Sequence, residues 1–230
     1  MARTGNLAFT DPHRSSGGLD PIVTRLYAEC LVRYDGDEVK AYMASALEQP
    51  DPATVTLRLR NDIKFADGTP LNAEAVKYSI ERGKDATLNA PVRPTFSLVD
   101  RVETPDEFTA ILKLVRPNAI FLPSWAYYSS VVSPTALEQA GPDNFNKKPI
   151  SAGPQNVDRI VQDGESVFTK DPEWPLKAPD GGALPYFDRV VNRIIPQPEA
   201  LVAALLAGDV DLVNSIDLAS VKQVQGSGGW

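Results

Sequence analysis

Residue types suited to catalysis or metal binding are scarce in this chain. It contains one histidine, His13, and one cysteine, Cys30. No pair of histidines or cysteines therefore exists at the spacing of a structural zinc site, and the sequence predicts no metal and no cofactor. A Ser-His-Asp triad would depend on His13 alone, which disfavours hydrolase chemistry. Acidic residues are plentiful, but no motif pairs two of them for glycoside hydrolysis, so we expect no catalytic residues.

Cys30 lies among apolar neighbours in the sequence, including Leu26, Tyr27, Leu31 and Val32. A cysteine in such surroundings usually packs as a small hydrophobic residue. No cationic residue stands beside it to activate the thiol. We therefore expect Cys30 in the core, and as the only cysteine it cannot form an internal disulfide.

Polar loops offer a different chemistry, the binding of a small molecule. The loop that begins at His13 is rich in small polar residues, whose backbone N–H groups could bond a ligand. Its arginine could form a bidentate pair with a carboxylate. The alternatives are a solvated charge and an ordinary surface loop. The candidate ligand residues of this loop are His13, Arg14, Ser15, Ser16, Gly17 and Gly18.

Two further segments carry candidate ligand residues. A proline-rich loop contains Arg93 and Phe96, and a later aromatic segment contains Tyr127 and Tyr128. Tyrosine combines a flat stacking surface with a hydroxyl group, and both suit a ligand site. Aromatic clusters at such spacing are also common in protein cores, so burial is the alternative for these side chains.

Composition and charge exclude several classes of protein. The 230 residues carry a formal net charge of −7, with a pI near 4.8, so the basic face of a nucleic-acid binder is lacking. An apolar fraction of 43% can build a sizeable core, and a charged fraction of 23% argues against wholesale disorder. No apolar run reaches the roughly 20 residues that span a bilayer. Residues 1–9 also lack the apolar stretch of a signal peptide.

Periodicity and turn signals predict hairpins that alternate with helices, which is typical of a mixed α/β or α+β fold. In residues 54–60 apolar and polar side chains alternate strictly, as in a strand with one buried face. Asn72 is placed to cap a helix that ends near Gly83. The other predicted helices cover 22–32, 121–128, 133–141, 198–207 and a segment from 218, and the other strands cover 99–103, 108–115, 158–161, 165–170, 187–195 and 210–213.

Four segments, in the same order along the chain, resemble segments of one family. They are Leu19-Asp20-Pro21 in the opening loop, Leu57–Val76 with the turn Asp67-Gly68-Thr69-Pro70, Arg116-Pro117-Asn118-Ala119, and Ala203–Val213. A single Asp-Gly-Thr-Pro turn carries little weight, but its occurrence in order with the other segments is specific. The chain is similar to the family 5 extracellular solute-binding proteins, which include dipeptide-, oligopeptide-, nickel- and glutathione-binding receptors of ABC importers.

The resemblance implies the fold of a periplasmic-binding-protein lobe that carries an extra α+β subdomain. Residues 1–40 and 150–230 are then expected in the first lobe, and residues 41–149 in the extra subdomain. Members of the family usually close two lobes over the ligand and are about twice this length. We therefore expect this chain to be the amino-terminal half, with the second lobe missing.

The resemblance also implies a function, the binding of a peptide or peptide-like small molecule and its delivery to the ABC permease of an inner membrane, without catalysis. The parent protein is expected in the periplasm, or outside the cell in association with the membrane. Ala152 and Gly153 match a turn at the hinge and cleft wall of the family. Ala152 replaces the usual threonine and Gln155 the usual aromatic residue, so both positions depart from the family pattern.

One lobe supplies only part of the ligand contacts of a two-lobed clamp, so weak or no binding is expected of this chain alone. The alternative function is that of an interaction module. Half of a binding protein exposes apolar surface, through which it could self-associate or complement a separate second lobe. The sequence does not identify the ligand, because one scaffold serves many ligands.

Overall fold

The computed structural model describes residues 1–7, 9–15 and 20–227 of the chain. Its mixture of helices and strands confirms the predicted mixed α/β class. The strands are β1 (Ala2–Arg3), β2 (Val32–Asp35), β3 (Glu38–Ala41), β4 (Ala44–Asp51), β5 (Thr54–Leu59), β6 (Val99–Asp106), β7 (Thr109–Leu114), β8 (Gln155–Arg159), β9 (Glu165–Lys170) and β10 (Arg189–Ile194). The α-helices are α1 (Asp20–Tyr27), α2 (Ala73–Lys84), α3 (Arg93–Phe96), α4 (Phe121–Trp125), α5 (Pro134–Phe145), α6 (Pro198–Leu206) and α7 (Leu218–Gly226), with one 3₁₀ turn at Ala86–Leu88.

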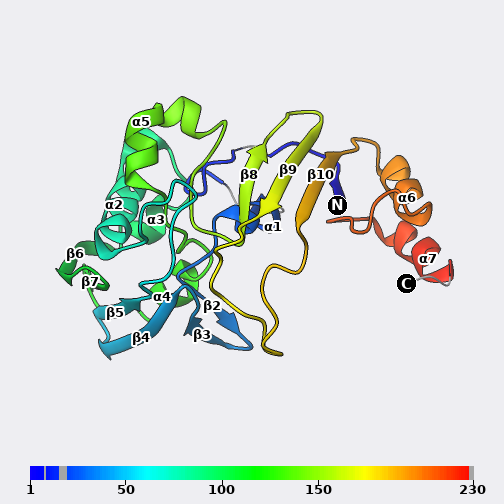
Figure 1. Ribbon diagram of the computed structural model, residues 1–230. Coiled ribbons are helices and arrows are strands. Elements are labelled where there is room, and N and C mark those ends of the chain that lie inside the picture. Colours follow the sequence, from blue (N-terminus) through cyan, green and yellow to red (C-terminus); the bar gives the residue numbers. More distant parts are fainter. Residues whose placement is uncertain (8, 16–19, 228–230) are drawn as a thin grey trace.

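One four-stranded sheet joins the start of the chain to its last third. The strand order is β1-β10-β9-β8. Strand β1 runs parallel to β10, with Ala2 opposite Arg193, and the other neighbours are antiparallel. Helix α1 packs against β8 (Figure 1). The loop that leads into α1 is therefore anchored to this sheet on both sides.

The other four-stranded sheet, β4-β5-β7-β6, is antiparallel throughout. The alternation predicted for β5 is confirmed, because Val55, Leu57 and Leu59 are all at most 5% exposed. Helix α2 contacts β6 and β7 (Figure 1). The predicted cap of this helix is also confirmed, since Asn72 Oδ1 accepts the backbone N–H of Ala75 at 3.0 Å.

The largest apolar core packs this second sheet against α2, α3 and α4. It also includes Leu31, Ala152 and Trp174, so apolar packing continues from the middle of the chain into the flanking segments. A smaller core lies between α1 and the first sheet, where the ring of Tyr27 stacks on that of Phe168 with centroids 5.7 Å apart. Cys30 is buried, as predicted.

The helix predicted for residues 22–32 is too long. It ends at Tyr27, and the chain then turns so that the backbone N–H of Leu31 donates to the carbonyl oxygen of Ser129 at 3.1 Å. This pairing with a distant segment overrides the local helical pattern, as tertiary contacts commonly do. The sequence patterns also missed β2, β3 and β4, most of whose residues are at least partly exposed, and only the short β3 alternates.

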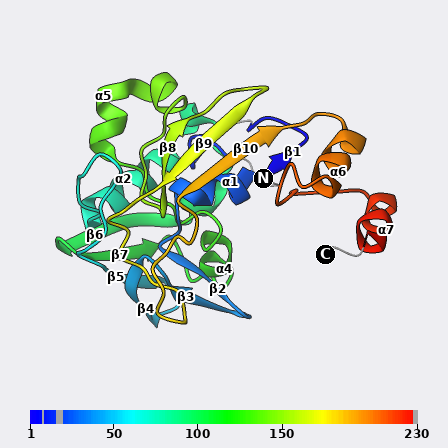
Figure 2. The ribbon, with the colours of Figure 1, turned by 45° about the vertical axis from the view of Figure 1, so that its right-hand side comes forward.

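The C-terminal helices α6 and α7 contact each other and lie beside β10, far from the β4-β5-β7-β6 sheet (Figures 1 and 2). The strand predicted for 210–213 is wrong, because it consists only of a bridge between Val213 and Ala2. Leu201 and Leu205 of α6 share a small core with Ala2. Of the helices in the described part of the chain, none has the length and apolar character required to span a membrane.

Candidate functional site

Residues from two of the predicted ligand segments meet in one small pocket. Its cavity measures about 20 Å³. The pocket lies between the loop that precedes α1, α1 itself and the segment that follows α4. Its lining residues are Pro12, Ser15, Thr24, Arg25, Tyr127, Tyr128 and Ser130. A cavity of this size admits one water molecule or one polar end group.

Ser15 places a buried hydroxyl at this pocket. The backbone N–H groups of Arg14 and Ser15 both donate to the carbonyl oxygen of Asp11 at 3.0 Å, which closes a tight turn. Ser15 is 5% exposed, and its Oγ has no hydrogen-bond partner within the described residues. A buried hydroxyl without a partner costs free energy. A ligand atom that forms a hydrogen bond with this hydroxyl would recover that cost, which favours binding.

Arg25 places a positive charge at the same pocket. It stands in the last turn of α1, and its side chain is half-buried. Within the described part of the chain, its guanidinium makes no hydrogen bond or ion pair. Burial raises the pKa of the nearby Glu29 carboxyl, while the charges of Arg25 and Arg33 act in the opposite direction. The sequence did not predict Arg25 as a ligand residue, because nothing in a short helical segment marks which face borders a cavity.

The two tyrosines differ in exposure. Tyr127 is 57% exposed, and its ring is tilted against that of Tyr34 at a centroid distance of 5.4 Å. Tyr128 is half-buried and packs against the main core. Ser130 completes this side of the pocket, and its hydroxyl donates to the carbonyl oxygen of Ala28 at 3.0 Å. Tyr127 is thus the more accessible of the two rings for a ligand.

His13 belongs to the loop that precedes α1, and its side chain is fully buried. Its Nδ1 lies 3.0 Å from Nη1 of Arg82, and its Nε2 lies 3.1 Å from the carbonyl oxygen of Ser130. Arginine can only donate, so Nδ1 accepts and the ring is a neutral Nε2–H tautomer. Burial lowers the pKa of His13 to about 4, and the charge of Arg82 also lowers it while that of Asp11 raises it. With both nitrogens occupied, His13 has a structural role in place of the predicted ligand contact.

A buried ion pair holds this histidine in place. Nη1 of Arg82 donates to Oδ1 of Asp11 at 3.1 Å, and Nη2 also contacts the other carboxylate oxygen. The Arg82 and Asp11 side chains are only 9% and 1% exposed. The backbone N–H of His13 donates to Asp11 Oδ1 at 3.0 Å. Because Arg82 belongs to α2, this cluster ties the loop before α1 to the middle of the chain.

The remaining predicted residues of the first two loops do not converge on the pocket. The guanidinium carbon of Arg14 lies 4.2 Å from the centroid of the Phe9 ring. Arg93 is exposed and donates from Nε to the carbonyl oxygen of Lys84 at 3.1 Å. Phe96 is 1% exposed and meets His13 edge to face, which is a core position. The predicted contacts from Ser16, Gly17 and Gly18 lie outside the described residues.

Ala152 and Gly153 pack against the chain at the end of α1. Both are buried, and the carbonyl oxygen of Ala152 accepts the backbone N–H of Glu29 at 2.8 Å. A Cβ atom at position 153 would come within 2.5 Å of the carbonyl carbon of Tyr27. Glycine is therefore required here by the close approach of two backbones, which is a packing role.

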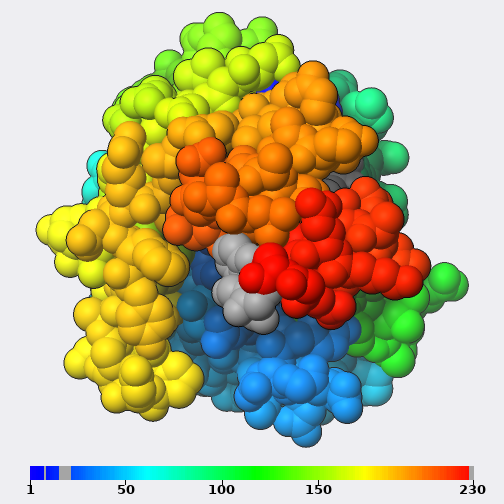
Figure 3. Space-filling model, turned by 90° about the vertical axis from the view of Figure 1, so that its right-hand side faces the viewer, coloured from blue at the N-terminus to red at the C-terminus, as the bar shows by residue number. Residues whose placement is uncertain are grey.

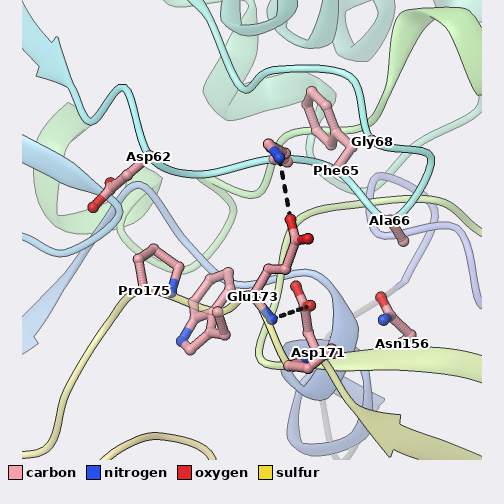
Figure 4. A pocket seen from close by; sticks show the side chains of 11 residues that line it. Asp62, Phe65, Ala66, Gly68, Asn156, Asp171, Glu173 and Pro175 are labelled. Carbon is pink, nitrogen blue, oxygen red and sulfur yellow. Dashed lines mark hydrogen bonds and ion pairs between the residues drawn. The ribbon is translucent and has the colours of Figure 1, made fainter.

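A larger pocket of about 210 Å³ separates the segment 62–68 from the loop 171–175 (Figure 4). Lys64 Nζ and Glu173 Oε2 form an ion pair across it at 3.1 Å, and the backbone N–H of Glu173 donates to Asp171 Oδ1 at 2.9 Å. Asp62 pairs with Arg60. Each charged side chain that lines this pocket thus has a partner, and none of the predicted site residues reaches it. Nor, within the residues described, is any group of three or more His, Cys, Asp or Glu side chains placed to hold a metal ion.

Comparisons with known sequences extend over almost the whole chain. The family model for bacterial extracellular solute-binding proteins, family 5 Middle, matches residues 38–229. A putative ABC transporter peptide-binding protein of Brucella ovis is 28% identical over 225 residues, which cover 91% of this chain and 40% of that protein. A probable D,D-dipeptide-binding periplasmic protein of Escherichia coli is 29% identical over 227 residues, covering 94% of this chain and 42% of that protein. The chain thus spans about 40% of the length of these relatives.

Solved structures share the fold. The PBP AgaA of A. tumefaciens R10, in complex with agropinic acid, is 28% identical with a TM-score of 0.82, and the match covers 92% of this chain and 42% of that one. The periplasmic binding protein DppA of Helicobacter pylori, in complex with the peptide STSA, is 23% identical with a TM-score of 0.83, covering 98% of this chain and 48% of that one. The described residues therefore have the fold of a periplasmic-binding-protein lobe, as predicted.

Proposed function

Because the chain belongs to the bacterial extracellular solute-binding proteins of family 5, we propose that it supplies one wall of the binding site of a solute receptor for an ABC importer. The ligand is a peptide or a peptide-like small molecule. The family binds solutes and does not catalyse reactions. The relatives named above include a peptide-binding protein of an ABC transporter and a D,D-dipeptide-binding periplasmic protein. Delivery to an inner-membrane permease and a periplasmic parent protein are part of the same proposal.

One observation supports a location for this binding wall on the molecule. The pocket between Ser15, Arg25 and Tyr127 combines a buried hydroxyl and a cation, neither of which bonds another described residue, with an exposed aromatic ring. Small-molecule sites typically place a few polar groups of this kind beside stacking surface. The larger pocket of Figure 4 lacks this combination, because Lys64 pairs with Glu173, Asp62 pairs with Arg60, and Asp171 accepts a backbone N–H.

The pocket also limits what this chain does alone. It accommodates one end group, so most of a peptide would remain uncovered. In a clamp, closure of a second lobe supplies the remaining contacts and favours the closed state. We therefore propose that the chain by itself binds peptides only weakly, with an affinity far below the submicromolar range.

The test is a titration of the ¹⁵N-labelled 230-residue chain with a mixture of dipeptides and tripeptides, followed by amide NMR. We expect fast-exchange shifts at Ser15, Arg25 and Tyr127 that saturate at millimolar peptide. Replacing Tyr127 by alanine should weaken them, whereas replacing Tyr186, which is 62% exposed and lies outside the pocket, should not. Absence of shifts at the pocket, or shifts at the 62–68 segment instead, would overturn the placement. Submicromolar affinity would overturn the single-wall argument.

The division of the chain into a first lobe (1–40 and 150–230) and an extra subdomain (41–149) belongs to the same proposal. Two observations support it. Strand β1 pairs with β10, which joins the first and last segments in one sheet. The four strands of the other sheet all lie between Ala44 and Leu114.

Self-association is a second candidate function, favoured by one observation. The segment near residue 186 and helix α7 both reach the face that is turned to the viewer in Figure 3, and both carry exposed large apolar side chains. They include Phe187 at 71% and Leu218 at 80% exposure. Exposed apolar side chains that gather into one patch favour a protein contact. A monomer at high concentration, measured by size-exclusion chromatography with light scattering, would exclude this function.

A further inference from the structure

We infer that Arg25 and Ser15 form a subsite for a carboxylate group, so that the solute is an anionic small molecule held by its acid end. This inference rests on the proposed receptor function and adds the chemical class of the ligand. Ser15 and Arg25 come from different elements, a turn and a helix, and both border the same cavity.

The guanidinium of Arg25 supplies the charge. Arginine binds a carboxylate through two parallel N–H···O bonds, which gives both strength and orientation. Within the described residues this guanidinium has no hydrogen bond or ion pair of its own. It therefore has free donors, unlike Arg82, which is committed to Asp11 and His13.

The hydroxyl of Ser15 supplies a second, independent indication. Ser15 is only 5% exposed, and its buried Oγ has no hydrogen-bond partner among the described residues. A hydroxyl can donate to a carboxylate oxygen and recover the free energy of its missing hydrogen bond. An apolar ligand end would leave this hydroxyl unsatisfied.

The dimensions of the pocket favour an end group over a whole molecule. A cavity of about 20 Å³ has room for an oxygen of a carboxylate, while the exposed ring of Tyr127 stands beside it to contact the rest of the solute. Arg14, the arginine predicted for this task, is not among the lining residues and lies over Phe9 instead.

Because the chain as a whole is negatively charged, the attraction for an acid has to come from the local charge of Arg25. With a formal net charge of −7, the overall field repels anions. Glu29, four residues beyond Arg25, adds to that repulsion whenever it is ionised, although burial raises its pKa. Binding of an acid therefore has to come from short-range bonds to Arg25 and Ser15, and it should weaken when Arg25 loses its charge.

The experiment compares two probes that differ only in their acid group, N-acetylglycine and N-acetylglycinamide. The ¹⁵N-labelled chain is titrated with each, and the Nε–H signal of Arg25 and the amide of Ser15 are followed. We expect a saturable shift of both signals with the acid and none with the amide. The change Arg25→Gln should weaken acid binding by about tenfold or more, as expected for a charge-assisted bond, and Ser15→Ala should weaken it less.

Arg33→Gln is the matched control. The guanidinium carbon of Arg33 lies 3.6 Å from the centroid of the Tyr42 ring, and Arg33 is not a lining residue of the pocket. This change should leave acid binding intact. Equal shifts with acid and amide, no saturable shift of Arg25, or an unaltered acid preference in Arg25→Gln would each overturn the inference. If dipeptides bind at the pocket equally well without Arg25, the carboxylate subsite is refuted and the receptor function stands. If the acid binds but no peptide does, the receptor function is refuted and the carboxylate subsite stands.

Discussion

The buried His13 should make the stability of the fold depend on pH. Protonation would place a charge between Arg82 and Phe96 in a fully buried site, where the charge of Asp11 and the bond to the Ser130 carbonyl offset only part of the cost. Burial therefore lowers the pKa of His13 from 6.5 to about 4. The unfolded chain binds a proton at His13 that the folded chain rejects, so stability must fall as the pH falls.

The size of this effect follows from the two pKa values. The folded-state pKa of about 4 lies below the unfolded value of 6.5, so the contribution is fully present above pH 6.5 and is lost between pH 6.5 and about 4. At about 1.4 kcal/mol for each pH unit between the two values, the loss amounts to roughly 3 kcal/mol. With a urea m-value of about 3 kcal/mol/M, the unfolding midpoint should move by roughly 1 M.

The assay compares the natural chain with His13→Gln. Glutamine can accept the Arg82 bond through its oxygen and donate to the Ser130 carbonyl through its nitrogen, but it does not titrate. Both chains lose stability at acid pH through their carboxylates, and that part cancels in the difference. The stability advantage of the natural chain over His13→Gln should therefore shrink by roughly 3 kcal/mol across the window.

A direct measurement complements the unfolding curves. Since the chain has a single histidine, its ring C–H signal in NMR reports this one pKa without ambiguity. A titration of the folded chain with an inflection near pH 6.5 would refute the reasoning. A pH dependence identical in the natural chain and in His13→Gln would refute it equally.

Two further predictions concern positions beside α1, the buried Gly153 and the partly buried Glu29. Gly153→Ala should destabilise the chain by about 1–3 kcal/mol, because the new Cβ would lie 2.5 Å from the α1 backbone, whereas Gly5→Ala, with no atom within 4 Å, should change little; equal urea midpoints would contradict this. Glu29→Gln should stabilise the fold at neutral pH, because burial raises the pKa of Glu29 and its ionised form therefore opposes folding. A lower urea midpoint for Glu29→Gln than for the natural chain would show that this carboxylate is favourably paired.

The candidate site was only partly predictable. The tyrosine pair and the serine of the opening loop were identified by residue type, and Ser15, Tyr127 and Tyr128 line one pocket. Their neighbour Arg25 was missed, because its role depends on which side of α1 borders the cavity. His13 and Phe96 were identified by type as well, but both are buried in this structure. Residue type shows what a side chain can do, and burial decides whether a solute can reach it.

Local signals in the sequence determined the elements that depend on neighbours in the chain. The alternation on β5 and the cap at Asn72 both follow from short-range geometry. The ordered segments that carry the family resemblance likewise determined the fold class. Such features are encoded within a few residues, so no distant contact is needed to find them.

Only the tertiary structure decided the rest. Helix α1 stops at Tyr27 because residues near 30 pair with the segment around Ser129. Gly153 is required because a backbone from elsewhere in the chain approaches it closely. Among the residues that the structure describes, Arg25 has no hydrogen-bond or ion-pair partner while Arg82 bonds both Asp11 and His13, although both are arginines near the end of a helix. Each outcome depends on groups far apart in sequence, whose proximity exists only after the chain has folded.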